Sequence, residues 1–138
     1  MYNKAGLLET VDVTEGAKRY PYVTGMVYNE KGQLITVFLE NGTAVRRAYD
    51  PETFRLVEMV VLSENVETLM DIRYQYDPVG NITRIEDLAQ QTVYFANQVI
   101  APVSTFTYDA LYRLTEATGR ELINLGKPGY QDVANSKG

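Results

Sequence analysis

The sequence predicts an all-β fold made of consecutive antiparallel β-hairpins. A Tyr followed by Asp or Asn and a short turn recurs five times along the chain. The segments beside these turns alternate apolar and polar residues with the period of two that is typical of strands. Helical periodicity is scarce. With 138 residues, 45% of them hydrophobic, the chain is one domain at most and can bury a core.

The five repeat openings follow the residue preferences of β-turns. Asp or Asn suits position i of a type I turn, Pro suits i+1 and Gly suits i+3. A Gly after such a turn also supplies the left-handed residue of a bulged hairpin. The tyrosines lie 26, 21, 27 and 32 residues apart, which indicates a hairpin unit of variable length. The predicted turn residues are Tyr2, Asn3, Gly6, Tyr28, Asn29, Gly32, Tyr49, Asp50, Tyr76, Asp77, Pro78, Gly80, Tyr108 and Asp109.

Two repeat openings depart from this pattern. Thr53 and Tyr112 stand where Gly is expected. At these two positions we expect either a different turn or about 1 kcal/mol of backbone strain.

The remaining elements follow from local patterns. Asn41-Gly42 between apolar runs predicts a tight hairpin turn in which Phe38 faces Val45 and Glu40 faces Thr43. Residues 63–65 predict another turn. The segment "ENVETLMDI" could form a short helix, but it leads into the alternating "DIRYQYD", so we favour a strand. "DLAQQ" suits one helical turn or a loop, and residues 122–138 suit a loop or flexible tail. The total is eight to ten short strands.

Composition excludes several classes of function. The net charge of −5 argues against nucleic acid and anionic membranes as partners. The chain has no Cys and no His, so Ser-His-Asp and Cys-His catalysis are impossible. No apolar run approaches the length of a membrane span, and no signal peptide is visible. We therefore expect no enzyme activity, no cofactor, no metal site and no membrane insertion by this segment.

The repeated carboxylates and tyrosines leave sharper alternatives open. Asp50, Asp77 and Asp109 could form an acid/base pair, but capping of their own turns is favoured because the repeat accounts for all three. "DPVGNITRIED" lacks the alternating acidic ligands of a calcium loop. The repeat tyrosines could form a platform for carbohydrate, although packing across strands explains their recurrence more simply.

The repeat resembles the YD repeat of RHS (rearrangement hot spot) proteins over about residues 2–121. "RYQYDPVGNITRIED" is nearly ideal for that repeat. The stretch "QQTVYFANQVIAPVSTFTYDALYRLTEATGRE", residues 90–121, looks like the YD-repeat region of the B component of Tc insecticidal toxin complexes and of SpvB-like proteins. "DPVG" at residues 77–80 also matches the letters of an RHS self-cleavage motif, but it lies inside a repeat, so a protease role is not carried over.

The resemblance implies a curved strip of hairpins that forms part of a hollow β-shell. It divides the chain into a YD-repeat region, residues 1–121, and a tail, residues 122–138. The implied role is structural, in a secreted or extracellular bacterial toxin whose shell encloses a toxic C-terminal domain. The implied partners are the toxin C component with that enclosed domain and the remaining shell of the parent protein. We also expect self-association through unpaired sheet edges. The alternative is a carbohydrate- or cell-surface-binding module that uses the repeat tyrosines.

Overall fold

The structure is a computed structural model that describes residues 1–95 and 98–119. Strands and turns account for its regular structure, and no helix occurs in this part of the chain. The all-β prediction is therefore confirmed, whereas the predicted tail lies outside the described residues. The strands are β1 (Val11–Glu15), β2 (Lys18–Tyr28), β3 (Leu34–Leu39), β4 (Ala44–Tyr49), β5 (Leu56–Leu62), β6 (Thr68–Tyr76), β7 (Ile82–Asp87), β8 (Val93–Phe95), β9 (Gln98–Ile100), β10 (Val103–Tyr108) and β11 (Leu114–Thr118).

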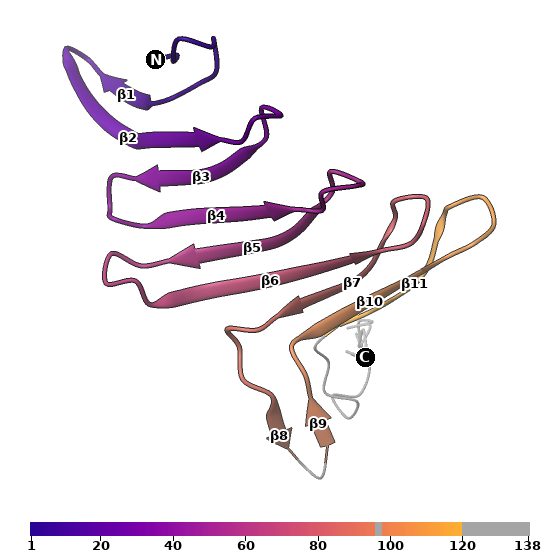
Figure 1. Cartoon of the computed structure of the whole chain (residues 1–138). Coiled ribbons are helices and arrows are strands. Elements are labelled where there is room, and N and C mark those ends of the chain that lie inside the picture. Colours follow the sequence, from indigo (N-terminus) through magenta and orange to yellow (C-terminus); the bar gives the residue numbers. More distant parts are fainter. Residues whose placement is uncertain (96–97, 120–138) are drawn as a thin grey trace, which may run out of the picture.

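Nine strands form one antiparallel sheet whose spatial order follows the chain. The order is β1-β2-β3-β4-β5-β6-β7-β10-β11, while β8 and β9 form a separate two-stranded hairpin. We call the turns that follow the repeat tyrosines the YD turns. Figure 1 shows an open, twisted sheet in which the YD turns lie at one end of the strands and the other turns lie at the opposite end. This is the strip of consecutive hairpins that the sequence predicts.

The unequal repeat spacing has a structural explanation. The shortest interval, between Tyr28 and Tyr49, contains two six-residue strands. The next interval is longer because β5 and β6 have seven and nine residues. The interval before Tyr108 is the longest because it includes the β8–β9 hairpin. All of this variation lies away from the YD turns, which keep nearly the same length.

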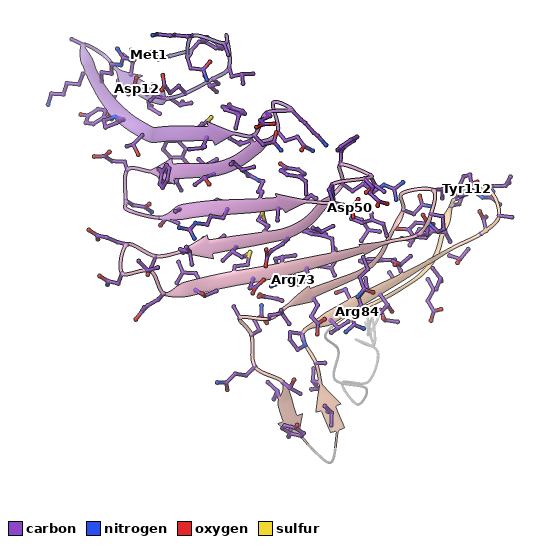
Figure 2. The ribbon with its side chains drawn as sticks, viewed as in Figure 1. Met1, Asp12, Asp50, Arg73, Arg84 and Tyr112 are labelled. Atoms are coloured by element: carbon purple, nitrogen blue, oxygen red, sulfur yellow. The ribbon has the colours of Figure 1, made fainter. Side chains whose placement is uncertain are left out.

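The two faces of the sheet differ in chemistry. Residues that pair across neighbouring strands share a face, and the tyrosine face carries an apolar row across five strands: Met26, Val37, Val45, Val61 and Met70. We call the other side the charged face. There, Arg73 forms ion pairs with Glu58 at 2.5 Å and Asp71 at 3.1 Å, and Arg84 pairs with Glu86 at 3.2 Å. Figure 2 shows Arg73 and Arg84 on β6 and β7.

Almost no side chain in the described residues is fully enclosed. The buried hydrophobic residues are Val23, Val37 and Leu62, and the one buried charged residue is Asp87. In a single-layer sheet, each side chain is covered only by its neighbours on the same face, and its outer surface remains exposed. The fold therefore derives its cohesion from contacts between adjacent strands rather than from a central core.

One predicted register is wrong. Phe38 pairs with Ala44 and Val37 pairs with Val45, so the hairpin is shifted by one residue from the expected pairing. Gly42 donates its N–H to the carbonyl of Leu39 and has a φ of +79°. The turn is therefore a bulged type I turn with Gly42 in the left-handed position, and not a two-residue Asn-Gly turn.

Two ambiguous segments are resolved by the structure. In the segment that could have been a helix, residues 68–72 belong to strand β6. The residues before them form a turn that closes through a hydrogen bond from the N–H of Val66 to the carbonyl of Ser63. Residues 87–91 form the end of β7 and a turn, without a helical turn.

Candidate functional site

The Asn or Asp after each repeat tyrosine holds its own turn. Asn29 Oδ1 accepts hydrogen bonds from the backbone N–H groups of Lys31 at 3.0 Å and Gln33 at 2.9 Å. The same bonds, to the residues two and four positions further on, recur at Asn3 and Asp109. These side-chain bonds satisfy backbone donors that a tight turn would otherwise leave to solvent.

Asp77 makes three side-chain hydrogen bonds within its turn. Its Oδ1 accepts from the N–H groups of Gly80 and Asn81, both at 2.8 Å, and its Oδ2 accepts from Asn81 Nδ2 at 2.8 Å. The N–H of Gly80 also bonds to the carbonyl of Asp77 at 3.1 Å. Gly80 has a φ of +106°, a backbone conformation that favours glycine.

The two openings without Gly use two different solutions. Tyr112 occupies the left-handed position directly, with a φ of +61°. In the turn of Asp50, the left-handed residue is Phe54 (φ +60°) and not Thr53, because this turn is one residue longer and closes from the N–H of Phe54 to the carbonyl of Asp50. Asp50 Oδ1 accepts from the N–H of Thr53 at 2.6 Å and from its hydroxyl at 2.9 Å.

The turn carboxyls have pKa values below the ordinary value of 3.8. The hydrogen bond from the N–H of Thr53 is the main cause at Asp50, and that from the N–H of Arg113 is the main cause at Asp109. At Asp77, desolvation raises the pKa, but the hydrogen bonds of the turn together outweigh it. All three groups are therefore ionised at neutral pH and act as acceptors.

The hydroxyl groups of four repeat tyrosines connect successive repeats. Tyr76 Oη donates a hydrogen bond to the carbonyl of Leu56, and Leu56 is the strand partner of the preceding repeat tyrosine, Tyr49. The other three hydroxyls make the equivalent bond. We call this set the tyrosine ladder: Tyr28 to Leu8 at 2.6 Å, Tyr49 to Leu34 at 3.0 Å, Tyr76 to Leu56 at 2.6 Å and Tyr108 to Ile82 at 2.8 Å.

The tyrosine ladder begins where backbone pairing between repeats stops. Between β5 and β6, the pairing nearest the YD turns joins Glu58 to Arg73, three residues before Tyr76. Beyond that point the strands diverge towards their separate turns, and the tyrosine hydroxyl reaches the carbonyl that the backbone no longer does. The same distance along the chain separates the last paired residue from the tyrosine at Arg46 and Tyr49 and at Thr105 and Tyr108.

Neighbouring turns also contact each other directly. Gln33 Nε2 donates to the carbonyl of Phe54 at 3.0 Å, and Lys31 Nζ lies 3.7 Å from the centre of the Phe54 ring. One repeat later, Arg55 Nη1 donates to the carbonyl of Asp77 at 3.0 Å. These contacts join the second repeat turn to the third and the third repeat turn to the fourth.

Sequence reasoning missed the hydroxyl bonds. It expected the repeat tyrosines to pack and stack, which requires a ring but no hydroxyl. The available signal was the residue type, because all five openings have Tyr and none has Phe. A ring that serves packing alone would tolerate either residue.

The carboxylates and hydroxyls of the repeat turns form their hydrogen bonds within the sheet. Each turn carboxylate bonds within its own turn, and no hydrogen bond joins two of them in the described residues. No group of three metal-ligating side chains occurs in residues 1–95 and 98–119. The same residues contain no helix long and apolar enough to cross a membrane. Four repeat tyrosines already use their hydroxyls on backbone carbonyls, which leaves those donors unavailable to a sugar.

Comparison with known proteins relates the chain to toxin complexes. No protein-family model matches it. The toxin subunits YenC2 and YenC1 of Yersinia entomophaga are both 32% identical to it, over 93% and 94% of this chain respectively and 14% of each subunit. The chain thus spans about one seventh of the curated relatives that it matches.

Solved structures show the same architecture. The TcdB2–TccC3 structure without its hypervariable C-terminal region is 35% identical, with a TM-score of 0.76 over 95% of this chain and 6% of that one. The Tc holotoxin pore of Photorhabdus luminescens is 35% identical, with a TM-score of 0.73 over 86% of this chain and 6% of that one. The two relatives are named as toxin subunits, and the first of these structures combines TcdB2 with TccC3. By its turns, its tyrosine ladder and these relatives, the chain is a YD-repeat (RHS) region of the Tc toxin type.

Proposed function

We propose that this chain forms part of the wall of a hollow β-shell that isolates a toxic domain from its surroundings. The observation that carries the proposal is the combination of an open single-layer sheet with a tyrosine ladder that fixes each repeat to the next. The wall of a shell requires an extended, continuous sheet more than it requires a hydrophobic core, and this sheet is both extended and continuous.

The partners follow from this role. The wall would continue into the remaining shell of the parent protein and would act together with a TcC-like component and its enclosed toxic domain. The solved relatives, in which TcdB2 and TccC3 occur together, support this assignment. The parent toxin would be secreted or extracellular, and this segment would have no catalytic role of its own.

A graft tests the proposal. The segment of a TcdB2–TccC3 protein that matches this chain is replaced by residues 1–119, and protease resistance of the enclosed C-terminal region is measured. We expect the graft to keep that region protected. The matched control is the same graft with the four donor tyrosines of the ladder changed to Phe, which should weaken protection. A correctly folded graft that leaves the C-terminal region open to protease would overturn the proposal.

A further inference from the structure

Arg47 is an exception at a position that is otherwise uncharged. The residue two positions before a repeat tyrosine lies on the tyrosine face, since alternate residues of a strand share a face. Among the repeat strands, that residue is Met26 in β2, Tyr74 in β6 and Phe106 in β10. In β4 it is Arg47, whose strand partner in β5 is Met59. The tyrosine face therefore carries a cation among apolar side chains.

The Arg47 guanidinium has no partner within the described residues. Its Nη1 is buried without a hydrogen bond, and Arg47 takes part in none of the ion pairs there. By contrast, Arg73 on the charged face is ion-paired with both Glu58 and Asp71. A buried, unpaired guanidinium N–H is costly, and buried charges in proteins are ordinarily paired.

Arg47 lines a cleft between the second and third repeat turns. The cleft has a volume of about 510 Å³ and is open to solvent. Its apolar lining includes Ile35, Ala48 and the rings of Tyr28, Tyr49 and Phe54.

The other charged residues of the cleft are Glu30, Lys31 and Asp50. Lys31 is engaged with the Phe54 ring, and the Asp50 carboxylate is engaged with the backbone of its own turn. Arg47 is thus the cation of this cleft that is left for an incoming acceptor.

We propose that this cleft binds a carboxylate group, supplied by an acidic residue of a protein segment that lies against the tyrosine face. A guanidinium pairs with a carboxylate through two parallel hydrogen bonds, and an apolar surrounding strengthens that interaction. The tyrosine and apolar lining fits hydrophobic residues on either side of the acid. The proposal deepens the wall function, because it gives the tyrosine face an occupant, but its experiment needs the isolated chain alone.

The test titrates the full chain with two peptides at constant ionic strength, N-acetyl-Leu-Glu-Leu-amide and the same peptide with Gln. The side-chain Nε–Hε signal of Arg47 is followed by ¹H–¹⁵N NMR. We expect a saturable shift with the Glu peptide and at least about tenfold weaker binding of the Gln peptide. Acetate is titrated in parallel. A response to acetate as strong as that to the Glu peptide would overturn the choice of a protein segment over a small free acid.

Two variants make the result specific. R47M introduces the residue found at the equivalent position in β2. Because this variant lacks the Arg47 signal, its binding is followed through the backbone amide signals of Ala48 and Tyr49, which also line the cleft, and it should lose the preference for Glu. R46M alters the neighbouring exposed arginine on the charged face and should leave binding unchanged. Equal binding of both peptides to the unmodified chain, or equal loss in both variants, would overturn the proposal. Neither outcome bears on the graft experiment, which measures protection of a different segment.

Discussion

Replacement of Tyr76 by Phe tests the tyrosine ladder directly. The substitution keeps the ring and removes only the hydroxyl, which donates at 2.6 Å to the carbonyl of Leu56. Burial raises the pKa of Tyr76 above its ordinary value of 10.0, so the hydroxyl remains a proton donor throughout the neutral range. A neutral intramolecular hydrogen bond contributes about 1 kcal/mol to the free energy of unfolding. In a chain of this length, that loss corresponds to a decrease in Tm of about 3–5 °C.

Urea denaturation followed by far-UV circular dichroism measures the effect. The matched control is Tyr74→Phe, because Tyr74 lies on the same strand and face and is half-buried, but its hydroxyl forms no hydrogen bond within the described residues. We expect Y76F to lower the free energy of unfolding by about 1 kcal/mol more than Y74F does. Equal stability of the two variants would refute the view that the hydroxyl connects successive repeats.

Three further predictions concern the turns. Val66 is 71% exposed and has a φ of +64°, a backbone conformation that is strained for valine and relaxed for glycine. V66G should therefore raise the free energy of unfolding by about 1 kcal/mol, whereas the control V79G, in an ordinary turn position, should not. Equal effects of the two variants in urea denaturation would contradict this. The Cβ added by G42A would lie 2.7 Å from Glu64 Cβ at a φ of +79°, so we expect a loss of at least about 1 kcal/mol, and an unchanged urea midpoint would argue against the bulged turn. Because folding lowers the pKa of Asp77, the ionised carboxylate stabilises the fold above the unfolded value of 3.8, and this stabilisation is lost as the pH falls through the folded pKa. Between pH 7 and pH 3, the urea midpoint of D77N should therefore decrease less than that of the unmodified chain. Identical decreases would exclude this contribution of Asp77.

Local chemistry was sufficient to predict consecutive antiparallel hairpins, but not that β8 and β9 leave the main sheet so that β7 pairs with β10. An Asp-Pro-x-Gly turn between alternating segments can only join adjacent antiparallel strands, so β6 and β7 and their equivalents followed directly from the sequence. The β3–β4 register was less accessible, because Asn-Gly is compatible with both a two-residue turn and a bulged turn. The hydrogen bond from Gly42 to Leu39 and the pairing of Phe38 with Ala44 distinguish them.

The connections between repeats were beyond sequence reasoning for a different reason. The bond from Tyr76 to Leu56 spans 20 residues. Its existence depends on where backbone pairing ends between two strands, which no residue pattern states. The lone position of Arg47 is also invisible in the sequence alone, where "AVRRAY" reads as an ordinary alternating strand with two basic residues. The structure shows that the two arginines lie on opposite faces.

Because every strand of the main sheet touches only the strands beside it, the sheet has no centre that must fail first. Pulled from one end, such a chain would yield one hairpin at a time, each step breaking one set of backbone bonds and one tyrosine hydroxyl contact. The force record would be a series of small, similar peaks rather than one large one. The mechanical work of unfolding would therefore be divided among the successive hairpins.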